Sequence, residues 1–128
     1  MKINRLEDII VWQESMRLMK MVYELVKSFP FEEKYNLIKH MKACARNIPA
    51  NIAEGYGRFH YQESTRFNRI ARGSLMELKS DCLCAINVGV TDKASVQPIL
   101  EQIESVNRLL NAFIQSTIKM QSKLANGQ

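Results

Sequence analysis

The last third of the chain carries the pattern that most restricts its fold. From Val96 to Leu124, apolar side chains and one threonine recur at alternating steps of three and four residues. This spacing repeats every 3.5 residues, so it places these side chains along one side of a long α-helix and favours left-handed packing against other helices. We predict a helix over residues 94–124 with a buried seam of Val96, Ile99, Ile103, Val106, Leu110, Phe113, Thr117, Met120 and Leu124.

Three earlier segments show the same helical spacing of apolar residues, over about residues 8–28, 32–56 and 62–89. The first of them has an apolar face wider than one core contact needs. Because the connections are short, consecutive helices must run antiparallel. The sequence therefore predicts an all-α fold, an antiparallel up-down-up-down four-helix bundle, with residues 1–128 as a single domain.

A proline interrupts the second predicted helix, in the stretch ARNIPANIAEGYGR at residues 45–58. Pro49 has no N–H to donate to the carbonyl of Ala45, and a proline inside a helix costs about 3 kcal/mol unless the helix bends or restarts. We therefore expect the second helix to be kinked or broken near Pro49. We expect it to end around the two glycines at 55 and 57.

The same stretch contains polar side chains that need partners. Asn51 and Glu54 are three residues apart, so they share one face of a helix. Folding the second and third helices about a turn near residue 59 or 60 places residue 54 near 65 and residue 42 near 77. Glu54 would then pair with Arg66 or Arg69, and Glu77 with Lys42 or Arg46.

We interpret Asn51, Glu54 and Glu77 as a structural polar network that fixes the register between these helices. The alternative is that Glu54 and Glu77 act as paired catalytic carboxylates. The same alignment places Gly73 opposite Arg46, where the missing side chain would make room for a close approach.

Positive charge is concentrated in the middle of the chain. Residues 34–79 contain nine Lys or Arg and three Glu, so nine minus three gives +6, against a net +5 for the whole chain. Such a basic centre suggests a polyanionic partner, RNA or DNA, although the same charges are also expected on a solvated helix face with internal ion pairs. The candidate nucleic-acid-binding residues are Lys39, Lys42, Arg46, Arg58, Arg66, Arg69 and Arg72.

Patterns typical of catalysis or metal binding are missing from the sequence. The glycines fit no phosphate-binding loop, and the two histidines, His40 and His60, are both expected on the surface. The odd number of cysteines reads as reduced thiols, most of them packed in the core. Cys82 and Cys84 point to different faces of a helix. We therefore expect a non-enzymatic protein with no catalytic residue, no cofactor and no metal.

Two observations bear on location. The apolar stretches are interrupted every few residues, so we expect no membrane-spanning segment. The segment Met1–Asp8 has no apolar core and contains acidic residues, so we do not expect a signal peptide. The cytoplasm is the compartment that these features and the reduced thiols favour.

Four motifs, in order, resemble one known family. IPANIAEGYGR at 48–58 closely resembles the signature of the four helix bundle protein family, also called the 23S rRNA intervening-sequence-encoded protein family. LEDIIVWQESMRL at 6–18 is similar to its opening helix, FPFEEKYNL at 29–37 to the start of its second helix, and RFNRIARGSLMELKS at 66–80 to its third helix. One departure is Lys39-His40-Met41-Lys42, where many relatives have Gln and Arg-Arg.

This resemblance implies a bundle that assembles as a ring-like homo-oligomer, commonly a pentamer, which would explain the wide apolar face of the first helix. A more distant relative, the accessory variability determinant of diversity-generating retroelements, is a basic pentamer that binds a reverse transcriptase and nucleic acid. We therefore expect a non-enzymatic oligomer that binds RNA or DNA. The alternative is a protein–protein scaffold or accessory subunit that docks a polymerase or other protein, with its cations mainly in internal ion pairs.

Overall fold

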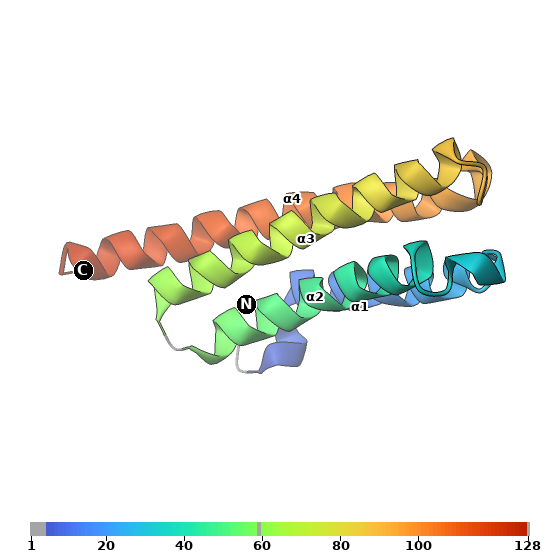
Figure 1. Ribbon diagram of the computed structural model, residues 1–128. Coiled ribbons are helices and arrows are strands. Elements are labelled where there is room, and N and C mark those ends of the chain that lie inside the picture. Colours follow the sequence, from blue (N-terminus) through green and yellow to red (C-terminus); the bar gives the residue numbers. More distant parts are fainter. Residues whose placement is uncertain (1–4, 59, 128) are drawn as a thin grey trace.

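The four segments of helical periodicity form four long helices in a computed structural model that describes residues 5–58 and 60–127 (Figure 1). The predicted single domain also included residues 1–4, 59 and 128, which lie outside these ranges. The described residues contain no strand. The long helices are α1 (Ile10–Val26), α2 (Leu37–Gly57), α3 (Tyr61–Asn87) and α4 (Lys93–Ala125), with short 3-10 helices at Leu6–Asp8 (η1) and Phe31–Glu33 (η2).

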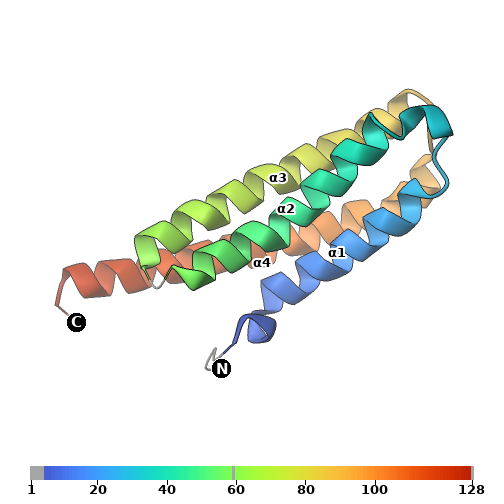
Figure 2. The ribbon, with the colours of Figure 1, turned by 60° about the horizontal axis from the view of Figure 1, so that its bottom comes forward.

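Successive helices run antiparallel, as predicted (Figure 2). Each helix packs against two others, in the cyclic order α1, α2, α3, α4, so that α1 lies diagonally across from α3. The predicted all-α, up-down-up-down four-helix bundle is confirmed. Within the described ranges, no helix combines the length and the apolar character that a membrane crossing requires.

The core lies between the four helices and consists mainly of aliphatic side chains. The seam predicted for α4 is buried from Val96 to Leu110 and again at Thr117. Beyond Leu110, Ile114 rather than Phe113 turns inward, because a helix of 3.6 residues per turn drifts away from a 3.5-residue repeat. Met120 and Leu124 are 37% and 62% exposed, since the last turns of α4 extend past the other helices (Figure 1).

The second helix begins later than predicted. Pro30 has an extended backbone, and the acidic residues that follow it form the short helix η2 instead of the first turn of α2. α2 then begins at Leu37, where the Glu33 carboxylate accepts hydrogen bonds from the Asn36 side chain at 2.9 Å and from the Leu37 N–H at 3.5 Å. Glu33 thus caps the start of α2.

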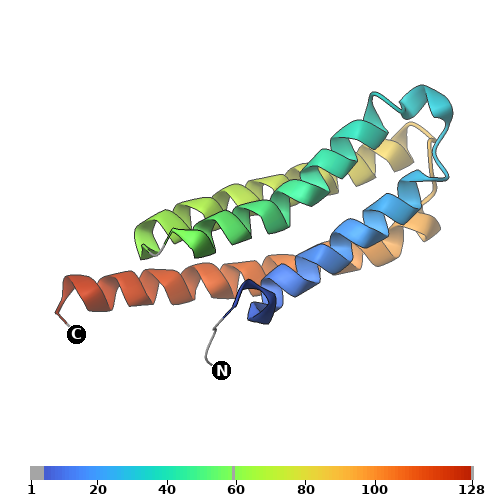
Figure 3. The same cartoon turned by 90° about the horizontal axis from the view of Figure 1, so that it is seen from below.

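α2 is not broken at Pro49. It runs without interruption from Leu37 to Gly57, and its ribbon changes direction along its length (Figure 3). Pro49 is buried, and the neighbouring Ile48 and Ile52 are fully buried. This burial offsets the loss of one backbone hydrogen bond, because each fully buried isoleucine contributes about 1.5–3 kcal/mol. The end of the helix at the predicted glycines is confirmed.

The glycine that permits close helix packing is Gly55, not Gly73. A Cβ atom on Gly55 would lie 3.1 Å from the Ser64 carbonyl oxygen and 3.2 Å from the Phe67 Cβ. Gly73 is exposed, and a Cβ there would meet no described atom of a neighbouring element within 4 Å. The prediction of a close approach at Gly73 was therefore wrong, since the exposed side of α3 carries that residue.

A glycine with positive φ ends α3. Gly89 has φ +80°, and its N–H donates to the carbonyl of Ile86 at 3.1 Å, while the N–H of Val90 donates to that of Ala85 at 3.0 Å. These paired hydrogen bonds form the Schellman motif, which satisfies two carbonyls at a helix end. The short connection to α4 follows directly.

Candidate functional site

The predicted nucleic-acid-binding cations all reach the surface of the bundle, but they do not form one continuous patch. The Lys42 ammonium lies 4.9 Å from the centre of the Tyr23 ring on α1. Arg72 donates to the Asn111 side chain on α4 at 2.9 Å. Because α1 packs against α2 and α4 packs against α3, these two cations lie on opposite sides of the bundle. Lys42 and Arg72 are half-buried, whereas the exposed members are Lys39, Arg46, Arg58, Arg66 and Arg69.

Two arginines share one aromatic ring near the turn between α2 and α3. The guanidinium carbons of Arg58 and Arg66 lie 5.2 and 4.6 Å from the centre of the Phe67 ring. Each arginine also pairs with a carboxylate in its own segment, Arg58 with Glu54 at 2.6 Å and Arg66 with Glu63 at 3.3 Å. These ion pairs are exposed, and such pairs contribute only about 0–1 kcal/mol. A stronger anion can therefore displace the carboxylates.

A groove between α3 and α4 adjoins this arginine pair. It has a volume of about 690 Å³, and both Arg66 and Arg69 line it. Arg69 is exposed and makes no salt bridge to any residue in the described ranges. The groove thus combines two guanidinium groups and the Glu63 carboxylate with neutral hydrogen-bonding and apolar side chains. Its remaining lining is Gln62, Glu63, Thr65, Ile70, Ile118 and Gln121.

Two of the remaining cations stand on α2. Lys39 and Arg46 are exposed, and neither forms a salt bridge with a residue that the structure describes. Lys39 is on the first turns of α2, and Arg46 follows it by seven residues, so both lie along one stripe of the helix. They are too far along α2 from the turn at Arg58 to join the groove.

The polar network predicted for Asn51 and Glu54 is not formed between α2 and α3. The Asn51 side chain donates to the carbonyl of Asn47 at 2.7 Å, and Glu54 pairs with Arg58 rather than with Arg66 or Arg69. Both contacts stay within the α2 segment, because a partner one turn away lies within reach without any constraint on the neighbouring helix. These residues therefore do not set the register of the bundle.

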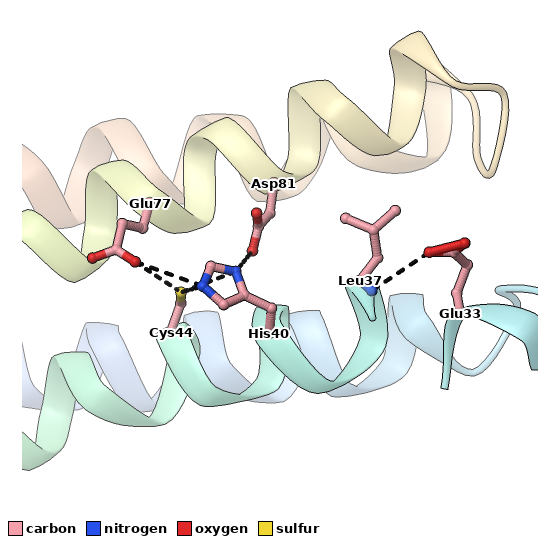
Figure 4. Close-up of polar contacts among 6 residues, drawn as sticks. All are labelled: Glu33, Leu37, His40, Cys44, Glu77 and Asp81. Atoms are coloured by element: carbon pink, nitrogen blue, oxygen red, sulfur yellow. Dashed lines mark hydrogen bonds and ion pairs between the residues drawn. The ribbon is translucent and has the colours of Figure 1, made fainter. Parts of the chain in front are cut away.

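Glu77 does reach across to α2, but its partners differ from those predicted. Its carboxylate lies 3.7 Å from Nε2 of His40 and 3.9 Å from the Cys44 sulfur, instead of beside Lys42 or Arg46 (Figure 4). Since Glu54 makes its contact at the other end of α2, the alternative of a Glu54–Glu77 catalytic pair does not fit this arrangement.

His40 and Cys44 on α2 face Glu77 and Asp81 on α3, and we call these four residues the His–Cys–acid cluster (Figure 4). The ring Nδ1 of His40 is hydrogen-bonded to the Asp81 carboxylate, and the Cys44 sulfur lies 3.8 Å from both ring nitrogens. This cluster was not predicted from the sequence, although the two α2 residues, like the two α3 residues, are four positions apart and therefore share one helix face.

The two buried thiols are held in their protonated form. Burial, the negative charges of Asp81 and Glu77, and a hydrogen bond to Glu77 raise the pKa of Cys44 to about 11. Burial and the charge of Asp81 raise the pKa of Cys82 to about 12. Cys84 is exposed. The prediction that most cysteines pack in the core is confirmed for Cys44 and Cys82.

Buried polar contacts that join helices come from residues for which no polar role was predicted from the sequence. The hydroxyls of Thr65 on α3 and Thr117 on α4 are hydrogen-bonded at 2.7 Å, and the Gln102 side chain on α4 donates to the Glu14 carbonyl on α1 at 3.0 Å. Asn68 is fully buried, and its amide makes no hydrogen bond to a described residue.

Residues 7–112 match the protein family described as 23S rRNA-intervening sequence protein. Comparison with curated proteins gives no match. The matched range begins within η1 and continues into α4, so it includes the α2–α3 turn, the His–Cys–acid cluster and most of the bundle. The chain therefore belongs to the 23S rRNA-intervening sequence protein family.

Proposed function

We propose that this protein is a non-enzymatic nucleic-acid-binding protein whose primary contact is the arginine-lined groove between α3 and α4. The observation that carries the proposal is the placement of Arg66 and Arg69 on the same groove with the side chains of Gln62 and Gln121. Guanidinium groups recognise phosphate oxygens through paired N–H donors, and amide side chains add hydrogen bonds to phosphate or sugar. The groove thus offers what a sugar–phosphate backbone requires.

The neighbouring arginine pair extends this surface toward the α2–α3 turn. The Phe67 ring orients the guanidinium groups of Arg58 and Arg66, which lowers the conformational entropy lost when they bind an anion. The carboxylates that now pair with these arginines are exposed, so exchange of a carboxylate for a phosphate costs little. Binding through phosphates alone would be largely independent of base sequence and strongly dependent on salt.

We further propose that the protein acts as a homo-oligomer, and the family resemblance favours a pentamer. Support comes from a shallow apolar groove on the outer side of α3, where Met76, Leu83 and Val88 are exposed together. Contiguous exposed apolar residues of this kind are typical of protein interfaces. Repetition of the arginine groove around an oligomer would multiply weak phosphate contacts through effective concentration.

The same apolar groove supports a second candidate, in which the bundle is a scaffold that docks a protein such as a polymerase. In that case the pairs of Arg58 with Glu54 and of Arg66 with Glu63 would persist in the complex. The substitution Leu83→Glu would abolish protein docking while leaving nucleic-acid affinity per chain intact. The two candidates can therefore be separated with variants. Loss of the groove arginines would remove nucleic-acid binding under the first candidate, and Leu83→Glu would remove the protein partner under the second.

The experiment is a fluorescence anisotropy titration of labelled RNA and duplex DNA with the wild-type protein and two double variants. One double variant replaces Arg66 and Arg69 with alanine. The matched control replaces Arg17 and Lys20, which are exposed on α1, diagonally across the bundle from α3. For each phosphate contact removed, we expect the slope of log affinity against log salt to fall by about 0.7–0.9.

We expect the groove variant to lose affinity and slope for both probes, and the control to keep both. Equal losses in the two variants would contradict the location of the site. No binding by the wild-type protein at low salt and micromolar concentration would contradict the function itself.

A further inference from the structure

The His–Cys–acid cluster has the composition and arrangement of a metal site. His40 and Cys44 are four residues apart on α2, and Glu77 and Asp81 are four residues apart on α3. Residues at this spacing lie one turn apart on the same face of a helix. Because α2 and α3 are antiparallel, Cys44 comes opposite Glu77 and His40 opposite Asp81, with all four side chains directed into the seam between the helices (Figure 4).

Three ligand atoms of the cluster form a nearly equilateral triangle. Nε2 of His40 lies 3.7 Å from Oε2 of Glu77 and 3.8 Å from the sulfur of Cys44, and the sulfur lies 3.9 Å from the same Glu77 oxygen. In a tetrahedral zinc site with bonds of about 2.0–2.3 Å, neighbouring ligand atoms are about 3.3–3.8 Å apart. The three atoms therefore have the separation that one metal ion requires, although the imidazole must turn for Nε2 to bind, because the Cys44 sulfur lies 3.8 Å from both ring nitrogens.

The fourth residue orients the imidazole. Nδ1 of His40 is hydrogen-bonded to the Asp81 carboxylate, so the ring proton is placed on Nδ1 and Nε2 is left with a free lone pair. A carboxylate that accepts a hydrogen bond from the far nitrogen of a metal-bound histidine is a recurrent feature of zinc sites. The Asp81 side chain is 15% exposed and so is more buried than that of Glu77, in keeping with a position behind the imidazole.

We propose that His40, Cys44 and Glu77 bind one divalent transition-metal ion of the Zn²⁺ class per chain, with Asp81 as a positioning residue. A thiolate and an imidazole select a borderline or soft cation over Mg²⁺ or Ca²⁺, which prefer oxygen ligands. Side chains of His40 and Glu77 are 54% and 62% exposed, so a water molecule can complete the tetrahedron from the solvent side.

The electrostatics of the cluster favour a cation. The two carboxylates of Glu77 and Asp81 face a single imidazole, and the Glu77 carboxylate also lies 3.9 Å from the Cys44 sulfur. When the metal binds, the S–H bond is replaced by a sulfur–metal bond and one proton is released to the solvent for each ion bound. The bound ion then links α2 to α3, so metal binding would raise the melting temperature in proportion to the logarithm of the metal concentration.

The test is a titration with Co²⁺ of the reduced, metal-free full-length protein, followed by absorption spectroscopy and calorimetry. Tetrahedral Co²⁺ with a thiolate ligand gives intense visible d–d bands and a thiolate-to-metal charge-transfer band in the near ultraviolet. We expect saturation at one equivalent per chain, displacement by Zn²⁺, and a higher melting temperature with Zn²⁺ than without it.

Three variants locate the site. Cys44→Ser and His40→Ala should abolish the charge-transfer band, and the exposed position of His40 keeps the second variant informative if the first fails to fold. Asp81→Asn should retain the band and weaken affinity about 10–100-fold. Cys84→Ser, which removes an exposed thiol on α3 outside the cluster, should change neither the spectrum nor the affinity.

Two outcomes would overturn the proposal. One is a wild-type spectrum with only weak bands of octahedral Co²⁺ and no charge transfer. The other is loss of the charge-transfer band in Cys84→Ser with retention in His40→Ala, which would assign the binding to the exposed thiol.

Discussion

A Cβ atom on Gly55 would lie 3.1 Å from the backbone carbonyl oxygen of Ser64, so the backbones of α2 and α3 are in close contact just before the turn that joins them. Neither backbone can move away independently, because Ile52 and Thr65, on the adjoining turns, are buried. The seam between these helices starts from this contact and continues past Cys44 and Glu77 to His40 and Asp81.

Two glycine substitutions test this contact. Gly55→Ala should destabilise the protein by about 1–3 kcal/mol, because the new methyl group overlaps the backbone of α3. Gly73→Ala, in the exposed interior of α3 with open space around it, should stabilise the protein by about 0.5–1 kcal/mol through helix propensity. Denaturant unfolding followed by circular dichroism measures both. The same sign for the two changes would contradict the assignment of the close contact.

The buried amide of Asn68 should reduce stability. It is fully buried without a hydrogen-bond partner among the described residues, and such groups cost about 1–3 kcal/mol. Asn68→Leu, which keeps the branched shape and the number of side-chain heavy atoms but removes the polar groups, should therefore raise the free energy of unfolding. The matched control is Asn47→Leu, an exposed position on α2, which should change it by less than about 0.5 kcal/mol. A less stable Asn68→Leu protein would show that the amide has a partner.

The three cysteines should differ sharply in reactivity. Cys84 is exposed, whereas Cys44 and Cys82 are buried with pKa values raised to about 11 and about 12, so their reactive thiolate forms are scarce at neutral pH. Iodoacetamide should modify only Cys84 in the native metal-free protein and all three thiols in denaturant. Mass spectrometry of labelled peptides over time gives the rates. Labelling of Cys82 as fast as Cys84 would contradict the packing of α3.

The Asp92 carboxylate, which caps the start of α4, should make the stability of the protein depend on pH. The Asp92 carboxylate accepts a hydrogen bond from the Ser95 N–H at 2.8 Å, and this contact lowers the Asp92 pKa. A lowered pKa in the folded state means that the contribution is present at neutral pH and is lost as the pH falls through the folded pKa, below the ordinary value of 3.8.

Asp92→Ala should therefore lower the melting temperature at pH 7, and the difference from the wild type should shrink as the pH is lowered toward 3. Thermal unfolding across this pH range measures the difference. A gap that widens on acidification would contradict the capping role. Asp92→Asn, which keeps an N-cap acceptor, should retain most of the wild-type melting temperature at pH 7.

The fold could be read from the sequence because it depends on spacing that repeats over many residues. The α4 seam from Val96 to Leu110 and the helix end at Gly89 follow from local rules of helix geometry. The predicted start of the second helix was wrong by about one turn, because Pro30 redirects the acidic residues after it into η2. Pro49 indicates a kink or a break locally, and the break does not occur, because burial of its neighbours keeps α2 continuous.

The candidate sites could be predicted less well, because they depend on the rotation of each helix about its axis. Gly55 and Gly73 look alike in the sequence, and only helix rotation decides which one faces a neighbour. Glu54 could pair with Arg58, four residues along the chain, or with Arg66 or Arg69 on α3. It pairs with Arg58, which is the nearest in sequence. The four-residue spacings in the His–Cys–acid cluster can be seen in the sequence. That the α2 side chains contact those of α3 can be seen only in the packed structure.

The measurement that tests the central claim most directly is light scattering coupled to size exclusion, on the protein with and without a short RNA at low salt. The account predicts a particle whose mass is a multiple of 14.8 kDa, and an increase by the mass of the RNA that disappears at high salt. A mass that RNA leaves unchanged at low salt, with the RNA eluting separately, would contradict it.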